Sequence, residues 1–157
     1  MKEDLCTFRQ WLIDCRWQVW SNHILNSERF KLYRNFGNTH DIKTYLLLNI
    51  DRHLKFITTR FRLGISDLNV HRLRYKNVKD SDLLCPMCHE AKEDEMHFVL
   101  LCPALQSIRE TFIRPKYYRW PCLFRLNLLL SCTDTNVVRN LSLYLYKAFR
   151  HREIATS

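Results

Sequence analysis

Four potential metal ligands lie close together in the middle of the chain, and their spacing constrains the fold more than any other feature. Cys85 and Cys88 are followed by His97 and Cys102, so the pattern is C-x2-C-x8-H-x4-C. The two-residue gap lets one tight turn present two thiolates to a single ion. A helix beginning near residue 94 would carry His97, and its end would deliver Cys102. We therefore predict one closed, structural Zn²⁺ site with these four ligands.

The residues around the ligands leave two alternatives. His89 offers a second imidazole, but it is adjacent to Cys88, where chelation by neighbouring residues would strain the turn, so His97 is preferred. Glu93, Asp94 and Glu95 precede His97. Carboxylates at a helix N-terminus are stabilised by the helix dipole, and we expect that role for them. One of the three is also a candidate to orient the imidazole.

Cysteine usage and the absence of a signal-peptide pattern bear on the cellular compartment. The seven cysteines are an odd number, which weakens a disulfide framework. No apolar run approaches the 18 or so residues of a membrane span, and no signal-peptide pattern follows the N-terminus. We expect an intracellular protein, cytoplasmic or nuclear, with reduced thiols and no membrane partner.

The sequence contains few features of an enzyme. The only glycines are Gly37 and Gly64, which excludes a P-loop and a dinucleotide fingerprint and argues against an all-β fold. No serine lies in a nucleophile-elbow motif, and the H-x-E signature of zinc deaminases is missing. A closed four-ligand zinc has no position for a substrate. We therefore predict a non-catalytic chain.

Apolar residues recur at helical spacing, so we predict a mainly α fold: a small helical domain with one embedded, knuckle-like CCHC site. The clearest stripes lie in 4–25, 51–63 and 136–152. Gly64 follows the second stripe, where a left-handed residue ends a helix. Shorter helical segments are expected at 27–36 (ended by Gly37), from Asp41, at 67–75 and at 103–113, with an aromatic, basic linker at 115–121.

Basic residues are concentrated in one block. The net charge is +9, and residues 52–79 hold eight Lys or Arg against one acidic residue, a net +7. Such a block favours a polyanion, because phosphate contacts release counterions. A solvated basic face is the alternative. Tyr117, Tyr118 and Trp120 are candidates to stack on unpaired bases, although packing is the commoner role for aromatic residues between prolines. The predicted contacts to RNA or DNA are Arg52, Lys55, Arg60, Arg62, Arg72, Arg74 and Lys76.

Several short motifs follow one another in a specific order. They are Arg62-Leu63-Gly64, Cys85-Pro86-Met87-Cys88, Glu93-Asp94-Glu95-Met96-His97-Phe98 and Cys102-Pro103. Together they resemble the C-terminal region of non-LTR (LINE-type) retrotransposon reverse transcriptases, with its CCHC zinc-binding domain. The stretches 27–33 and 143–152 are also similar to that family, so the resemblance spans about residues 26–152.

The resemblance implies a zinc module that helps a polymerase engage template RNA or target DNA, with the four ligands named above. The polymerase aspartate pair and an endonuclease domain are missing from this sequence. The resemblance therefore implies either a C-terminal part of such a protein or a stand-alone protein derived from one. In the second case, a protein-interaction or regulatory module with a purely structural zinc is the alternative, and helices 4–25 or 136–152 would be its docking faces.

We expect three regions within one compact unit. Residues 1–76 form a helical region with the basic face, residues 77–113 form the zinc module, and residues 114–157 form a linker and the C-terminal amphipathic helix.

Overall fold

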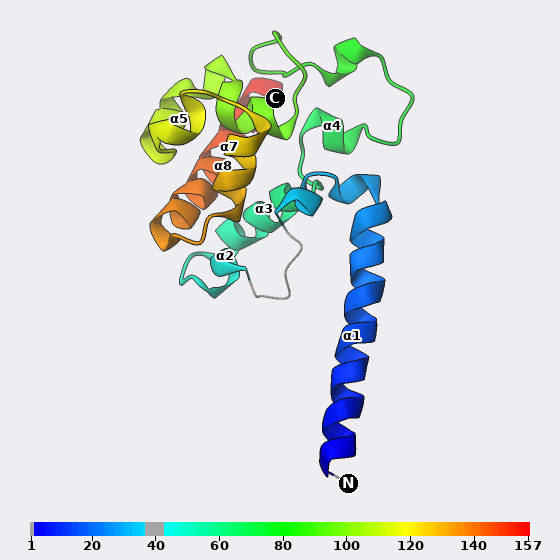
Figure 1. Cartoon of the computed structure of the whole chain (residues 1–157). Helices are drawn as coiled ribbons and strands as arrows, with labels where there is room; N and C mark the ends of the chain where they lie inside the picture. The colour runs from blue at the N-terminus through cyan, green and yellow to red at the C-terminus, as the bar shows by residue number, and fades with distance from the viewer. Residues whose placement is uncertain (1, 37–42) are drawn as a thin grey trace.

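Helices make up most of the chain in the computed structural model, which describes residues 2–36 and 43–157 (Figure 1). Within these ranges there is no β-strand, and Leu84 and Lys92 form an isolated antiparallel bridge. The α-helices are α1 (Lys2–Asn26), α2 (Thr44–Leu47), α3 (Arg52–Arg62), α4 (Asn69–Arg72), α5 (Gln106–Phe112), α6 (Pro115–Tyr118), α7 (Leu123–Ser131) and α8 (Thr135–Thr156). The prediction of a mainly α fold is confirmed.

Single turns connect these helices. Four are 3-10 turns: η1 (Glu28–Phe30), η2 (Tyr33–Asn35), η3 (Asp80–Leu83) and η5 (Pro103–Leu105). The fifth, η4 (His97–Leu101), is a π-helical turn. The predicted helix at 27–36 is therefore two separate 3-10 turns, which are common as connectors. The stop at Gly37 and the helix start at Asp41 lie outside the described residues.

The core forms around α8, which lies beside α2, α3 and α5 (Figure 1). Asp134 begins the helix, because its carboxylate accepts the N–H groups of Asn136 and Val137. The predicted inward stripe is confirmed. Its members Val138, Leu141, Leu145 and Ala148 are buried, and Phe149 packs on Phe98 with ring centroids 4.7 Å apart.

Helix α3 begins and ends as its sequence predicts. The carboxylate of Asp51 accepts the His53 N–H at 2.6 Å. Gly64 has φ +65°, and the Ile65 N–H donates to the Arg60 carbonyl at 3.0 Å, as at a left-handed helix end. A Cβ atom on Gly64 would lie 2.6 Å from the Arg29 carbonyl oxygen, so this position also needs glycine for close backbone approach.

Two helices lie where the sequence analysis assigned none. The predicted linker at 115–121 begins with α6, whose Pro115 occupies the first helical turn, where the missing N–H costs nothing. Helix α7 follows, and it buries Leu126, Leu129 and Leu130 against the core. These leucines have helical spacing, which is the signal that could have predicted α7.

Helix α1 is the longest element and extends away from the rest of the molecule (Figure 1). Its C-terminal part packs on the turns that follow: Ile24 is buried, and the Trp20 ring meets the Tyr33 ring edge-on at 6.2 Å. Residues 5–14 are all exposed. The predicted helix is present, but most of its apolar side chains are outside the core. Across the described residues, no helix combines the length and the apolar character that a bilayer span requires.

Candidate metal centre

A tight turn presents the first two ligands. The Cys85 N–H donates to the Ala91 carbonyl at 2.8 Å, and the His89 N–H donates back to the Cys85 carbonyl at 2.9 Å. His89 has φ 58°, a left-handed conformation that closes the turn, and its side chain is exposed. The imidazole that joins the cysteines is that of His97, as the sequence analysis preferred.

The π-helical turn η4 presents the other two ligands. Asp94 caps its start, since the carboxylate accepts the His97 N–H at 2.7 Å. The Cys102 N–H donates to the His97 carbonyl at 2.7 Å, five residues back. In an α-helix, residues five apart lie about 140° apart around the axis. The wider π turn reduces this separation, so His97 and Cys102 reach the same side.

The four predicted ligands converge on one point. One donor atom from each of Cys85, Cys88, His97 and Cys102 lies within 4.8 Å of the others. Cys85 Sγ and Cys102 Sγ are 3.8 Å apart, and Cys88 Sγ is 3.3 Å from His97 Nε2. All seven cysteines are free thiols. A group of three thiols and one imidazole, with three of its members buried, can hold one metal ion.

The buried thiols already favour one deprotonated sulfur. The pKa of Cys85 is lowered, because the Cys102 thiol donates a hydrogen bond to it and outweighs the effect of burial, with further help from His97. The pKa of Cys102 is raised, because this hydrogen bond and burial both keep its proton in place. Metal binding requires thiolates, and the lowered pKa of Cys85 reduces the free-energy cost of deprotonating one of the three thiols.

Two side chains of the helical core hold η4 in place. Arg109, itself 1% exposed, donates to the Val99 carbonyl at 2.9 Å and to the Cys102 carbonyl at 2.6 Å. The Tyr144 hydroxyl donates to the Phe98 carbonyl at 2.6 Å. Carbonyl groups at the end of a helical turn have no partner within it, and here buried donors from α5 and α8 satisfy them. The core therefore fixes the backbone that carries His97 and Cys102.

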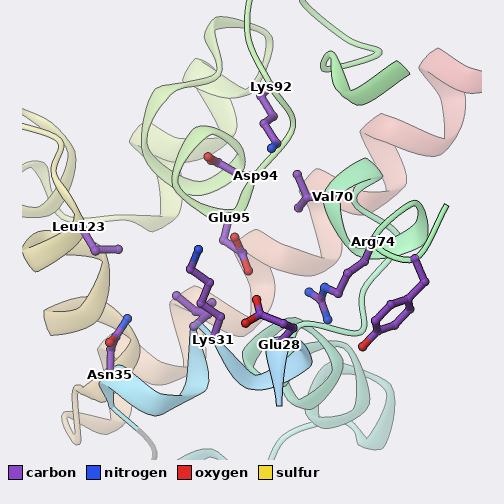
Figure 2. Close-up of a pocket in the computed structure, with 11 residues that line it drawn as sticks. Glu28, Lys31, Asn35, Val70, Arg74, Lys92, Asp94, Glu95 and Leu123 are labelled. Atoms are coloured by element: carbon purple, nitrogen blue, oxygen red, sulfur yellow. The ribbon is translucent and has the colours of Figure 1, made fainter. Parts of the chain in front are cut away.

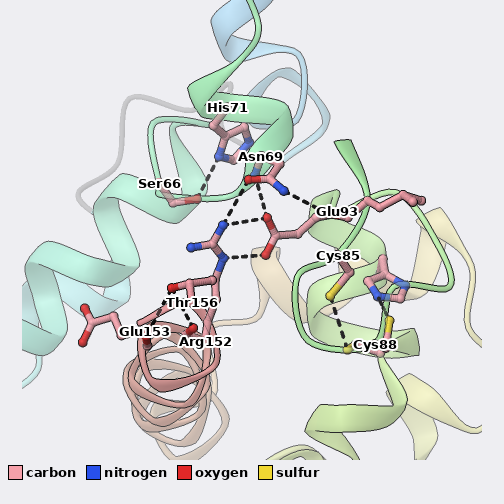
Figure 3. Close-up of polar contacts among 12 residues, drawn as sticks. Ser66, Asn69, His71, Cys85, Cys88, Glu93, Arg152, Glu153 and Thr156 are labelled. Atoms are coloured by element: carbon pink, nitrogen blue, oxygen red, sulfur yellow. Dashed lines mark hydrogen bonds and ion pairs between the residues drawn. The ribbon is translucent and has the colours of Figure 1, made fainter. Parts of the chain in front are cut away.

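A buried ion pair connects the segment that carries the four ligands, the metal loop of residues 80–105, to α8 (Figure 3). Both carboxylate oxygens of Glu93 accept from Arg152, with Nη2 at 2.9 Å from Oε2. Glu93 also accepts the Asn69 N–H at 2.7 Å, and the Asn69 amide donates to the Leu84 carbonyl at 2.9 Å. Burial lowers the pKa of Arg152, but the hydrogen bond and charge of Glu93 outweigh it, so the pKa is raised.

A second polar chain joins the loop to α4. Ser66 Oγ lies 2.8 Å from His71 Nδ1, and His71 Nε2 lies 2.8 Å from a carboxylate oxygen of Glu95. Burial would raise the pKa of Glu95, but the hydrogen bond from His71 and the charge of that residue lower it below its ordinary value. Asp94 accepts the His97 N–H, as fits the role expected of a carboxylate at the start of this segment. Glu93 and Glu95 contact Arg152 and His71 instead of the ligand imidazole, which corrects the expected orienting role.

Sequence reasoning gave no positioning role to these side chains, although a signal was present. Arg152 continues the buried stripe of α8, seven residues after Leu145 and four after Ala148. Arg109 lies four residues after the buried Leu105. A charged residue at an inward position of a helix requires a buried partner, because an unpaired charge there is costly.

The predicted phosphate contacts are not equally accessible. Arg62 is 5% exposed, its guanidinium lies over the rings of Phe36 and Tyr45, and it donates to the Leu130 carbonyl. Burial lowers its pKa, although the tyrosines oppose the shift. The prediction that Arg62 contacts a phosphate is wrong for this structure, because its position at the end of α3 faces α7 and not solvent.

Three other basic residues of the predicted phosphate contacts lie against groups of the same protein. The Lys55 ammonium donates to the Leu46 carbonyl at 2.9 Å, and Arg60 pairs with Asp67 at 3.2 Å. Arg74 points into a hollow that it shares with Glu28 and Glu95 (Figure 2). The side chains of Arg52, Arg72 and Lys76 are exposed.

The three aromatic candidates for stacking also differ. Tyr117 is buried, and its hydroxyl lies 3.9 Å from Cys132 Sγ. Tyr118 is half-buried, whereas Trp120 is 74% exposed. Packing therefore explains Tyr117, and Trp120 is the candidate with an accessible ring face.

Comparisons with known proteins found no match for this chain among protein families, curated proteins or solved structures.

Proposed function

We propose that the Cys85, Cys88, His97 and Cys102 cluster binds one Zn²⁺ ion. With Zn–S bonds of about 2.3 Å, two thiolates on a tetrahedral zinc lie about 3.8 Å apart. The Cys85 and Cys102 sulfurs have a separation of 3.8 Å, whereas a disulfide requires about 2.05 Å. Three sulfurs and one imidazole are a donor set that zinc prefers.

The role of this zinc is structural. Four protein ligands fill a tetrahedral site and leave no position for water or substrate. The loop that carries the ligands contains little regular secondary structure of its own. Zinc-binding energy in such a loop is folding energy, because the site does not exist in the unfolded chain.

We further propose that the domain is a non-catalytic, intracellular module that binds RNA or DNA, as its resemblance to the retrotransposon reverse-transcriptase C-terminal region implies. The main support is the exposed basic side chains of Arg52, Arg72 and Lys76 on a chain of net charge +9. Each contact of such a residue with a phosphate releases counterions. Trp120 offers a ring on which an unpaired base can stack.

The test is a fluorescence-anisotropy titration of the zinc-loaded protein with single-stranded RNA, structured RNA and duplex DNA over a salt series. Binding should weaken with salt, with a log-log slope of about −0.7 to −0.9 per phosphate contact. Arg72→Glu with Lys76→Glu should weaken binding about tenfold or more. Arg139→Glu with Lys147→Glu reverses the same charge on α8 and should have a smaller effect. No binding at about 50 mM salt would overturn the proposal.

One observation favours a second function, a protein-interaction module. Helix α1 exposes large apolar side chains, including Phe8, Trp11 and Val19, at 57–71%. Exposed contiguous apolar surface is typical of protein contacts. If the titration shows no nucleic-acid binding and Phe8→Lys abolishes binding to a protein partner, this second function replaces the first.

A further inference from the structure

The exposed side of α1 has the residue spacing of a coiled-coil seam. Apolar residues follow one another at alternating intervals of three and four along it, which is the a and d spacing of a heptad repeat. They are Leu5, Phe8, Leu12, Cys15 and Val19. Their side chains are exposed at Leu5 (65%), Phe8 (57%), Leu12 (42%) and Val19 (71%), and Cys15 is half-buried.

The helix lacks intramolecular support along this seam. Residues 5–14 are all exposed, and they include Phe8, Trp11 and Ile13, whose intrinsic helix propensity is modest. Most helical stability in proteins comes from tertiary packing of an apolar side, and short isolated helices are marginal in water. Another chain covering the seam would supply that packing.

The body of the molecule leaves the seam open. Trp20 and Ile24 are among the residues that join α1 to the rest of the protein. At about 100° per residue, these two side chains lie about 100–140° around the helix from the centre of the seam. His23, at position e beside the seam, meets the Phe30 ring of the same molecule with centroids 5.7 Å apart, so the body approaches the seam at its C-terminal end. A second helix can therefore lie along the seam from Leu5 to Val19, before that contact.

The flanking charges select the orientation of a paired copy. With Leu5 at position a, Arg9, Arg16 and His23 all take position e, and Trp11 takes position g. In an antiparallel pair of identical helices, e residues lie beside e residues, which would place basic groups together. In a parallel pair, e residues lie beside g residues, so Arg16 meets Trp11 of the second copy in a cation–π contact.

Two more features fit a parallel, in-register pair. A hollow beside Arg16, lined also by Cys15, Val19, Trp20 and His23, lies where Trp11 of the second copy would enter. Asn22 takes the next d position and is exposed. In register it meets its own counterpart, and a polar Asn in a seam fixes register and oligomeric state.

We propose that α1 is a dimerisation helix, which pairs in parallel with α1 of a second copy of this chain through Leu5, Phe8, Leu12, Cys15 and Val19. The pairing places two zinc-binding bodies at the same end of a two-helix stalk. This inference is independent of the metal and of the nucleic-acid function.

Sedimentation equilibrium of the full, zinc-loaded chain after nuclease treatment tests the pairing. The monomer mass is 19.1 kDa, and we expect a reversible species of twice that mass. Phe8→Lys with Leu12→Lys should raise the dimer dissociation constant at least tenfold. Gln10→Lys with Ile13→Lys is the matched control: it adds the same two charges at exposed positions away from the seam and should leave the constant unchanged. A mass of 19.1 kDa up to about 1 mM would overturn the proposal.

Disulfide formation tests the orientation. In a parallel pair the two Cys15 residues face each other at position d, within the 4.4–6.8 Å Cα separation that a disulfide spans. Mild treatment with oxidised glutathione should therefore link two chains through Cys15, with glutathione as the electron acceptor and released as the thiol. Cys15→Ser should abolish this link. Cys6→Ser should preserve it, because Cys6 is exposed at position b. A dimer without the Cys15 link would overturn the parallel seam.

Discussion

The metal loop, residues 80–105, and helix α1 differ in how order is maintained. The loop has short turns and little regular structure, yet Cys85, Glu93 and Phe98 within it are fully buried. Helix α1 has 25 residues of regular structure, yet residues 5–14 within it are all exposed. Local regularity and tertiary anchoring are thus separate properties: the loop has the second without the first, and α1 is regular throughout but anchored only at its C-terminal part.

The difference follows from the partners that each region finds. The loop receives buried donors from Arg109, Tyr144 and Arg152, which lie on α5 and α8. Helix α1 satisfies most of its backbone hydrogen bonds internally, and the Leu25 carbonyl near its end accepts from Arg34 at 2.8 Å. Its apolar side chains remain available for another molecule. Changes in the loop should therefore affect folding strongly, whereas changes in α1 should not.

Loss of the metal site should have the largest effect. Cys88→Ser removes one ligand and leaves three polar groups without their shared ion. We expect zinc content to fall and the free energy of unfolding to drop by several kcal/mol, because metal binding and folding are coupled. Cys122→Ser, at an exposed cysteine, is the control. Thermal denaturation and metal analysis measure both; an unchanged Tm in Cys88→Ser would rule out a structural zinc.

Breaking the buried ion pair should rank second. Arg152→Met leaves the carboxylate of Glu93, which is 0% exposed, without its charged partner. Removal of one member of a buried pair typically costs about 3–5 kcal/mol. Urea denaturation should detect this loss, whereas Arg150→Met, at an exposed neighbour, should change stability by less than about 0.5 kcal/mol. Equal effects of the two variants would contradict a stabilising role of the Glu93–Arg152 pair.

A direct comparison of apolar residues in the two regions should give the third effect. Leu141→Ala, on the buried side of α8, should cost about 2–5 kcal/mol through lost burial and a cavity. Ile13→Ala, on α1 and outside the proposed seam, should cost less than about 0.5 kcal/mol, because this side chain is 42% exposed. Chemical denaturation of both variants at one protein concentration measures the contrast, and similar losses would show that α1 belongs to the core.

A smaller loss is expected at the junction between the N-terminal turns and α3. Gly64→Ala adds a Cβ at φ +65° and within 2.6 Å of the Arg29 carbonyl oxygen. We expect destabilisation of about 1–3 kcal/mol, which lowers Tm by several degrees for a chain of this length. Differential scanning calorimetry gives the shift. A higher Tm, the usual result of Gly→Ala at a compatible position, would be inconsistent with the left-handed turn.

Local patterns predicted much of this molecule. The stripe of α8 and the glycine after α3 are properties of neighbouring residues, and both are present. The four ligands were also predicted, because their spacing and chemistry leave few alternatives. Patterns at helical spacing indicated the helix α1, but not that its apolar side would face outward, since the same spacing is typical of a core helix.

What could not be predicted depends on contacts between distant residues. Charge suggested that Arg62 binds a phosphate. In the structure its guanidinium instead donates to the carbonyl of Leu130, 68 residues away. The pairing of Glu93 with Arg152 joins residues 59 apart. Neither acceptor is visible in the local sequence, because burial of a charge becomes possible only when a distant group solvates it.

The position of α8 after the metal loop in the sequence has a consequence for synthesis. Thr58 bonds to Ser142, and Asn69 to Arg152, across 84 and 83 residues. Contacts so distant in sequence slow folding, because a long loop must close before they form. On the ribosome, the cysteines of the metal loop emerge well before the helix that fixes them, at about 5–20 residues per second. For that interval the nascent chain carries thiols without the contacts of α8, and the Glu93–Arg152 pair that holds the metal loop can form only after Arg152 has left the exit tunnel.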